Sequence, residues 1–432
     1  MMLLRTTFAA WLLVVSCAAT AQTVLKVFAG GPSQRPDITR QLLADYMQRN
    51  PGVRVEVETG GATSDLQRQY LSTLLNARDP GIDVYLIDIV NPAQYHGAGW
   101  LAPLNTLLGA PQKVLAPYLP AYAGSNVVEG ELAAMPAFAD AMFLYYRRDL
   151  LEKHGQPLPR TWDELAASAK LIQAAEKAAE KAAQPATVRV TGGAVLQGLS
   201  IQGAPIEGAV CTFLLPYWGQ GKAFNDASGR LTLDRPAAVR GLQMWLGVMD
   251  SGVIKRNVAE VRSQDTMNEF KAGQVLFAIH WSVAWDRFQN DADSRVKGKV
   301  GVMPLPAMAG GRPATCLGGW QWAVSAFSRR PAEAAALVAF LSSAEASRAY
   351  AVRGSLLPSH SALYTDPQVL QALPWIAQAR EAVQTAQSRP LSPDYPQVSD
   401  TIRSATNAVL ARTKTPERAV AEVGSRLARV MR

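Results

Sequence analysis

The sequence has few residues of the kinds that usually hold metals or perform nucleophilic catalysis. Only three of its 432 residues are cysteine and four are histidine, with no Cys-x-x-Cys pair and no zinc-ligand spacing. It also contains no Gly-x-Ser-x-Gly elbow, no phosphate-binding P-loop and no Gly-x-Gly-x-x-Gly turn. We therefore expect no metal site, no cofactor and no ATPase or serine-hydrolase chemistry in this chain.

The charge of the chain is not clustered. There are 43 basic and 35 acidic residues, and the basic excess is spread along the sequence without a basic run. Because nucleic-acid-binding proteins gather Lys and Arg on one face or stripe, the composition gives little support for nucleic-acid binding. No stretch after the N-terminal segment is long and apolar enough to cross a membrane, so the body of the chain is expected to be soluble.

Residues 1–21 are typical of a signal peptide. Arg5 supplies a short positive region, residues 8–15 an apolar stretch too short to span a bilayer, and residues 19–21 an Ala-x-Ala cleavage pattern. Residues 14–17 also resemble a lipobox, in which Cys17 would be acylated. Both interpretations predict export, either as a soluble periplasmic protein or as one anchored through Cys17.

Cleavage after Ala21 leaves two cysteines, Cys211 and Cys316. In an oxidising compartment the two could form a disulfide. The sequence does not show that they meet in space, and two separate buried thiols are equally compatible with it.

Strand and helix patterns alternate over the first hundred residues after the signal segment. Apolar or alternating runs predict strands, and amphipathic runs between them predict helices, at residues 24–28, 38–47, 53–57, 66–75 and 83–89 in turn. This order predicts a parallel sheet covered by helices, an α/β fold. Ligands of such sheets bind beyond the carboxyl ends of the strands, here near Gly30, Gly31 and Asp88.

The later part of the chain is more helical. Thr161 and Glu164 have the spacing of a capping box at the start of a helix. Residues 274–279 and 299–303 have strand patterns, and residues 416–431 form an amphipathic helix pattern. A mature chain of about 410 residues is long for one core, so two domains are expected.

Five segments in a fixed order resemble the bacterial extracellular solute-binding proteins, in particular their trehalose/maltose-binding branch. The resemblance runs from about residue 24 to residue 410. The segments are residues 70–75 with 83–88, residues 136–141 with 144–151, residues 279–285, residues 298–306 with 317–320, and residues 389–396.

The resemblance implies a two-lobed periplasmic-binding-protein fold, in which each lobe is a sheet flanked by helices. Three chain crossings would join the lobes, near Ala139, Cys316 and Leu370. The N-terminal lobe would then contain residues 22–139 and 317–370, and the C-terminal lobe residues 140–316 and 371–432. The solute would be held in the cleft between them.

The resemblance also implies which charged residues contact the solute. A neutral sugar carries many hydroxyls, which carboxylates accept strongly and to which Arg donates in a fixed fork. Asp88 and Asp140 would accept hydroxyl protons from opposite sides of the cleft. Arg389 would donate to a sugar oxygen and could pair with one of these aspartates.

Aromatic and small residues complete the expected site. Trp281 and Trp320 would stack on the apolar faces of sugar rings, and the backbone amides of Gly318 and Gly319 could approach the ligand closely. Trp285 lies four residues after Trp281, so the two would share a face on a helix and one of them would belong to the core. The remaining candidates are Phe138, which stands where relatives often have tyrosine, and Gln34 and Glu207, on turns expected to face the cleft.

These features predict a binding component of an ABC importer rather than an enzyme. It would capture a neutral disaccharide of the maltose or trehalose type as a monomer and deliver it to membrane permease subunits with their ATPase. Two aspartates against one arginine favour a neutral ligand. The alternatives are a secreted carbohydrate-active enzyme, and the same fold binding a monosaccharide, an oligosaccharide or a sugar phosphate.

Overall fold

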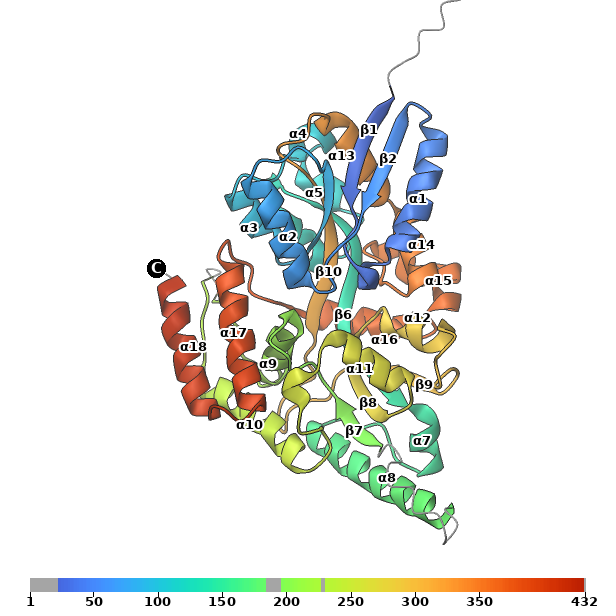
Figure 1. Ribbon diagram of the computed structural model, residues 1–432, viewed down its shortest axis with the longest axis vertical. Helices are drawn as coiled ribbons and strands as arrows, with labels where there is room; N and C mark the ends of the chain where they lie inside the picture. The colour runs from blue at the N-terminus through green and yellow to red at the C-terminus, as the bar shows by residue number, and fades with distance from the viewer. Residues whose placement is uncertain (1–21, 184–195, 227–229, 431–432) are drawn as a thin grey trace, which may run out of the picture.

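The computed structural model describes residues 22–183, 196–226 and 230–430. The predicted signal peptide and Cys17 lie outside these ranges. The described chain forms two lobes stacked along the long axis of the molecule, as Figure 1 shows. We call the part around strands β1 to β3 the first lobe, and the part around β7, β8, α9 and α17 the second lobe. No helix within the described ranges is long and apolar enough to cross a membrane.

The first lobe begins with the predicted alternation of strands and helices. The elements are β1 (Thr23–Phe28), α1 (Pro36–Arg49), β2 (Val53–Glu58), α2 (Ser64–Asn76) and β3 (Val84–Asp88). Strand β1 pairs in parallel with both β2 and β3. All residues of β3 are buried, as expected for a parallel strand covered on both faces. These elements confirm the α/β prediction and place Asp88 at the end of a buried strand.

Two long strands join the lobes. Strands β6 (Met135–Arg147) and β10 (Cys316–Val324) are antiparallel and run through the middle of the sheet, whose order is β2-β1-β3-β10-β6-β8-β7. At one end β10 pairs with β3, and at the other β6 pairs with β8 (Val275–Trp281) and β9 (Val300–Met303). The sheets of the two lobes are therefore one continuous sheet.

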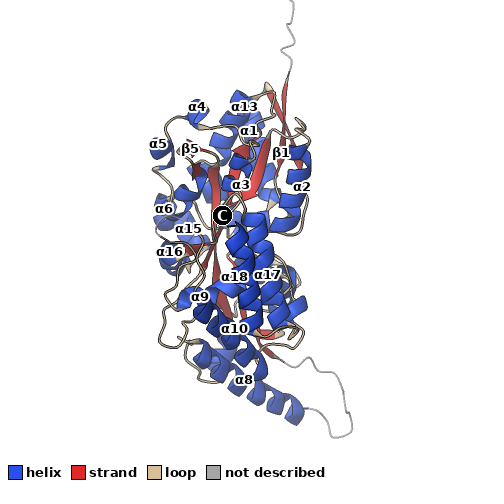
Figure 2. Ribbon diagram, turned by 90° about the vertical axis from the view of Figure 1, so that its left-hand side faces the viewer, coloured by secondary structure: helices blue, strands red, loops and turns tan. Residues whose placement is uncertain are grey.

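Helices cover the second lobe. Its larger helices are α8 (Trp162–Ala183), α9 (Glu207–Gly219), α10 (Arg235–Asp250), α11 (Ser263–Lys271), α12 (Ala284–Asn290), α17 (Tyr395–Leu410) and α18 (Pro416–Val430), with strand β7 (Gln197–Ser200). Figure 2 shows α17 and α18 side by side over this lobe. At the start of α8 the Thr161 hydroxyl accepts from the Glu164 amide at 3.2 Å, but the Glu164 carboxylate accepts from the amide of Arg160 rather than of Thr161. Only one half of the predicted capping box is therefore present.

Further elements lie outside these groups, besides three short 3-10 helices. They are η1 (Pro32–Gln34), α3 (Pro92–Gly97), α4 (Asn105–Leu108), α5 (Pro111–Leu115), α6 (Pro120–Ala123), β4 (Val127–Val128), β5 (Glu131–Leu132), α7 (Arg148–Lys153), α13 (Pro331–Leu341), α14 (Ala344–Gly354), α15 (Pro367–Ala372), α16 (Ile376–Thr385) and β11 (Gln387–Ser388). Of the positions where crossings were expected, Ala139 lies in β6 and Cys316 begins β10. Leu370 lies in α15, which packs against α14, whereas the later strand β11 pairs with β10.

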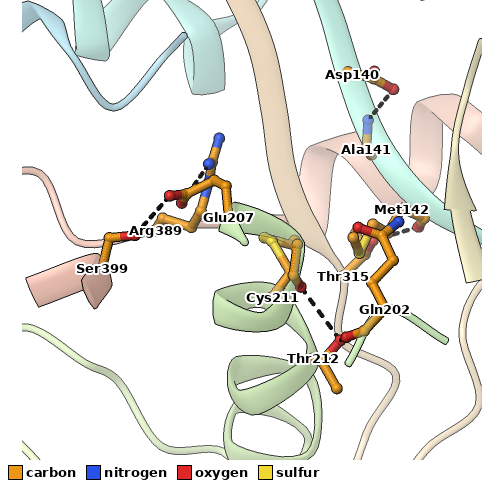
Figure 3. Close-up of a disulfide and its surroundings, with 12 residues drawn as sticks. Asp140, Ala141, Met142, Gln202, Glu207, Cys211, Thr212, Thr315, Arg389 and Ser399 are labelled. Atoms are coloured by element: carbon orange, nitrogen blue, oxygen red, sulfur yellow. Dashed lines mark hydrogen bonds and ion pairs between the residues drawn. A yellow bond between two sulfur atoms is a disulfide. The ribbon is translucent and has the colours of Figure 1, made fainter. Parts of the chain in front are cut away.

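The two cysteines form a disulfide. Cys211 lies on α9 and Cys316 at the start of β10, with an S–S bond of 2.05 Å and a Cα–Cα distance of 5.7 Å. Both residues are fully buried. The bond ties a helix of the second lobe to the strand that runs into the first lobe, as Figure 3 shows.

Candidate functional site

A cavity of about 370 Å³ lies at the junction of the two lobes. Its walls come from the turns after β1 and β2, the ends of β3 and β8, the middle of β6, the first turns of α9 and α11, and β10. All sequence-predicted site residues except Phe138 line it: Gln34, Asp88, Asp140, Glu207, Trp281, Gly318, Gly319, Trp320 and Arg389. The structure thus brings together residues as far apart in the sequence as Gln34 and Arg389.

Arg389 is the centre of a buried charge network in the cavity wall. Its Nη2 donates to Asp88 Oδ1 at 2.6 Å, and its Nη1 donates to Glu207 Oε1 at 2.8 Å. The arginine side chain is only 2% exposed. Burial by itself would lower the pKa of Arg389, but the charges of Asp88 and Glu207 outweigh it and raise the pKa well above the usual value, so the guanidinium stays charged. Ser64, at the start of α2, donates to Asp88 Oδ2 at 2.6 Å. The predicted pairing of Arg389 with Asp88 is present.

Two further side chains hold Glu207. Tyr395, the first residue of α17, and Ser399, one turn later, both donate to its carboxylate, Ser399 at 2.7 Å. Figure 3 shows Glu207 between Ser399 and Arg389. Sequence reasoning missed these two residues. Tyr395 lay inside a segment that carried the family resemblance, but its role depends on where α17 packs, and no local pattern shows that.

Asp140 lies apart from this network, midway along β6. Its Oδ1 accepts hydrogen bonds from the backbone amides of Ala141 and Ser282, both at 2.9 Å. Burial raises the pKa of this carboxyl to about 7, opposed by the two amides and assisted by the nearby charge of Asp88. Asp140 is therefore a carboxyl that can accept or donate a hydrogen bond near neutral pH.

Trp281 ends strand β8, and Trp285 lies on the following helix α12. The expectation that they share one helix face is therefore wrong, because the chain turns between them. A Cβ atom added to Gly318 would lie 2.5 Å from the Trp281 ring. The absence of a side chain at this position makes room for the indole, which is a different reason for the glycine from the one that the sequence suggested.

Trp281 is held from behind by His280. The Nδ1 of His280 accepts from the amide of Trp281 at 2.9 Å, and its Nε2 lies 3.1 Å from the carbonyl oxygen of Ser263 in the first turn of α11. Burial lowers the pKa of His280 to about 4, so the ring is neutral at ordinary pH. The Ser263 hydroxyl also lies 3.2 Å from His280 Nε2. Because Nδ1 accepts the Trp281 amide, the neutral ring carries its proton on Nε2 and donates from there, so in this tautomer it does not act as a base towards Ser263.

Gly319 and Trp320 continue the wall along β10. Gly319 has φ of +135°, and a Cβ atom there would lie 2.7 Å from the Tyr122 ring. The Tyr122 hydroxyl donates to the Asp140 carbonyl at 2.5 Å and accepts from the Asp140 amide at 3.0 Å. Gly319 thus allows Tyr122 to hold the backbone of Asp140, and Trp320 lies directly opposite Asp88 in the sheet.

The structure does not bring Phe138 to the cavity. Its side chain is 1% exposed, and its ring centroid lies 5.2 Å from that of Tyr350 on α14, which covers it. Phe138 therefore influences the site through its packing against Tyr350 and not through a contact with the cavity.

Several lining residues were not predicted. They include Thr63 and Ser64 at the start of α2, Gln202 after β7, and Arg262 and Ser263 at the start of α11. Gln202 is 2% exposed, and its Nε2 has no hydrogen-bond partner among the described residues. For Thr63 and Ser64, the signal in the sequence was the glycine pair at residues 60–61, just before α2.

The arrangement combines flat apolar surfaces with hydrogen-bonding groups. It offers two indole faces, a carboxyl held through Oδ1 by two backbone amides, and many hydroxyl and amide groups. Within the described ranges, no group of three or more His, Cys, Asp or Glu side chains could hold a metal ion. The site therefore has the parts that recognise a polyhydroxylated molecule.

Comparison with known proteins gives consistent results. The family model for bacterial extracellular solute-binding proteins matches residues 31–348. A probable ABC transporter-binding protein from Deinococcus radiodurans is 34% identical over 393 residues, which cover 90% of this chain and 89% of that protein.

Solved structures share the whole fold. Maltose-bound MalE3 from T. maritima has a TM-score of 0.85 and 31% identity, covering 94% of this chain and all of that one. A solute-binding protein from Agrobacterium radiobacter in complex with ribitol has a TM-score of 0.80 and 22% identity, covering 94% of this chain and 98% of that one. The family match, the relative and the two-lobed fold agree, and this chain belongs to the bacterial extracellular solute-binding proteins of ABC transporters.

Proposed function

We propose that this protein captures a neutral disaccharide of the maltose or trehalose type in the cavity between its lobes and delivers it to the permease of an ABC importer. The single observation that supports this most strongly is the pairing of Trp281 and Trp320 with Asp140 around one cavity. Indole faces suit the apolar faces of sugar rings, and the carboxyl suits their hydroxyls.

The charges of the cavity favour a neutral ligand. Arg389 is already bound by Asp88 and Glu207, so its charge is compensated inside the protein. Arg262 is the other arginine of the lining, and it is exposed at the start of α11. A phosphate group would require more than one available cationic partner. Of the two arginines that line this cavity, only Arg262 is not already paired with carboxylates of the cavity.

The cavity volume and the maltose-bound relative support a disaccharide in particular. About 370 Å³ lies in the lower part of the range of small-molecule sites, which suits a ligand of two rings better than a long oligosaccharide. The T. maritima structure with maltose bound is 31% identical to this chain over nearly its full length. Its ligand is therefore the first candidate for this cavity.

We further propose that the two lobes close on the solute. Residues 22–139 with 317–370 would form one lobe, and residues 140–316 with 371–432 the other. The family implies export to the periplasm, which residues 1–21 would direct and Cys17 could convert to a lipid anchor. Permease subunits with their ATPase would then recognise the loaded, closed form of a monomer.

The ligand can be tested by tryptophan fluorescence during titration with maltose, trehalose, sucrose, maltotriose, glucose, ribitol and glycerol 3-phosphate. We expect a saturable change with one disaccharide in the wild type and a clearly weaker affinity in Trp320→Leu. Trp100→Leu is the matched control, because Trp100 is also 8% exposed but does not line the cavity. A response only to glycerol 3-phosphate, or only to ribitol, would contradict the disaccharide.

The alternative of a carbohydrate-active enzyme makes a different prediction. The protein would be incubated with the sugar that binds best, and the mixture analysed by chromatography. The binding function predicts that the sugar is recovered unchanged. Accumulation of monosaccharides, lost in Asp140→Asn, would support the enzyme instead.

A further inference from the structure

Two ion pairs outside the cavity connect the lobes. Arg35 of the first lobe binds Asp286 on α12 of the second, with Nη1 to Oδ2 at 2.6 Å. Arg403 on α17 approaches Asp65 on α2, with Nη1 to Oδ2 at 3.4 Å. None of these four residues lines the cavity. The two pairs lie at different places in each lobe, since Arg35 precedes α1 and Asp65 lies on α2, whereas Asp286 lies on α12 and Arg403 on α17. Separating the lobes would have to break both pairs.

Arg35 is held in place before it reaches across. Its backbone is left-handed, with φ of 54°, and its guanidinium forks onto Asp37 of the same lobe through Nε at 2.9 Å and Nη2 at 2.8 Å. A Cβ atom at Gly354 would lie 3.2 Å from the Arg35 side chain, so this glycine leaves room for it. The remaining Nη1 is thus directed at Asp286, and little side-chain entropy is lost when the pair forms.

The Arg403–Asp65 pair is incomplete in this structure. Its separation of 3.4 Å is not a hydrogen bond, and Arg403 Nη1 and Asp65 Oδ1 are both buried without a hydrogen-bond partner among the described residues. Buried charged groups without hydrogen bonds are costly. Arg403 Nη2 already donates to Asp400 Oδ1 at 3.3 Å on the same helix, and a small further approach of α17 towards α2 would bring Nη1 within hydrogen-bond distance of Asp65 Oδ2, the oxygen that faces it. Helix α17 also carries the two residues that hold Glu207 at the cavity.

We propose that these two pairs, Arg35–Asp286 and Arg403–Asp65, determine the solute affinity of this protein by stabilising closure of the lobes. The first pair stabilises the approach of the lobes without solute, and the second becomes hydrogen-bonded when solute brings the lobes fully together. Affinity depends on the fraction of molecules in the binding-competent form, so residues that never touch the solute can change it. The inference rests on the proposed binding of solute in the cleft.

The test measures lobe separation and affinity in the same variants. Spin labels at Gln48→Cys on α1 and Lys177→Cys on α8, both exposed positions, report the distance between lobes by pulsed electron resonance. Titration calorimetry with maltose reports affinity. The variants are Asp286→Asn and Arg403→Met. The control is Glu345→Gln, which removes the 2.6 Å Arg49–Glu345 pair within the first lobe.

For Asp286→Asn we expect a longer distance without maltose and about tenfold weaker affinity, equal to about 1.4 kcal/mol. For Arg403→Met we expect the ligand-free distance of the wild type, a longer distance at saturating maltose and weaker affinity. The charge-reversed double variant Asp65→Arg with Arg403→Asp should recover part of that affinity. Glu345→Gln should behave as the wild type in both measurements.

An unchanged distance between the two spin labels in ligand-free Asp286→Asn would overturn the proposal, whether or not the affinity for maltose changes. Weaker affinity without any change of distance would overturn it as well, because closure would then not be the cause. If the wild type binds no maltose, the proposed ligand fails, and the ligand-free distances of Asp286→Asn still decide whether the first pair holds the lobes together.

Discussion

Among single residues, Asp140 is a cavity residue whose ionisation the protein environment changes strongly. Burial raises its pKa from 3.8 to about 7. The folded chain therefore keeps a proton that the unfolded chain loses between about pH 4 and pH 7, and this group makes folding less favourable as the pH rises through that window. Above about pH 7 both states are ionised and its effect on stability is constant.

Asp140→Asn should remove this pH dependence. A shift of about three pKa units corresponds to ~4 kcal/mol. The free energy of unfolding of the variant, relative to that of the wild type, should therefore rise by up to that amount from pH 4.5 to pH 8. Urea unfolding at both pH values measures the difference. In Asp163→Asn, at an exposed carboxylate on α8, the free energy of unfolding should change with pH as it does in the wild type. If the free energy of unfolding of Asp140→Asn changed with pH as much as that of the wild type, Asp140 would be solvated in the folded chain.

The sequence predicted the cavity residues whose position follows from local structure. Asp88 ends a buried strand, and Trp320 follows two glycines, so both were expected at the binding edge, and both line the cavity. Tyr395 and Ser399 were not predicted, because their contact with Glu207 depends on the packing of α17 against α9. The ligand roles of all these residues stay predictions until a sugar is bound.

Among the elements, strand β10 shapes the site through its glycines. Gly318→Ala would place a Cβ atom 2.5 Å from the Trp281 ring and force the indole to move. We expect the variant to fold, with a sugar affinity lowered about tenfold or more, as measured by calorimetry. Gly247→Ala on α10 is the matched control, since nothing lies within 4 Å of its added Cβ and the helix should gain slightly in stability. Unchanged affinity in Gly318→Ala would show that Trp281 does not contact the sugar.

The disulfide connects helix α9 to β10, one helical turn after Glu207. It closes a loop of 105 residues, so its removal should destabilise the chain by about 2–5 kcal/mol. The double variant Cys211→Ala with Cys316→Ala should show this loss in urea unfolding. Wild-type protein that has been unfolded and kept reduced should behave in the same way. A variant as stable as the oxidised wild type would mean that the unfolded chain is not constrained by the bond.

Element prediction from the sequence succeeded where one periodicity dominated. The pattern of alternating strands and helices up to residue 89 matches β1 to β3 with α1 and α2. The sequence did not decide whether Cys211 and Cys316 form a disulfide, because neither cysteine has a local signal that identifies its partner. The continuity of the sheet through β6 and β10 was also not predicted, since the buried positions of β6 run together without alternation. Such strands can be recognised only from the elements that pack on both faces.

At the scale of the whole molecule, the cavity and the bridging ion pairs depend on how the lobes face one another. The family and its two-lobed fold are established by the match over residues 31–348 and by the maltose-bound relative. The residues assigned to each lobe, and the motion between lobes, are proposals. The expected third crossing near Leu370 lies in α15, within contact of α14, and β11 offers a later position where the chain meets β10.

The measurement that tests the central claim most directly is calorimetric titration of maltose and trehalose into folded protein that has been freed of ligand by unfolding and refolding. The account predicts saturable binding of one sugar per chain to at least one of them, weakened in Trp281→Leu and retained in Trp100→Leu. Absence of heat with both sugars, from protein with native circular dichroism and an intact disulfide, would contradict the disaccharide assignment of this cavity.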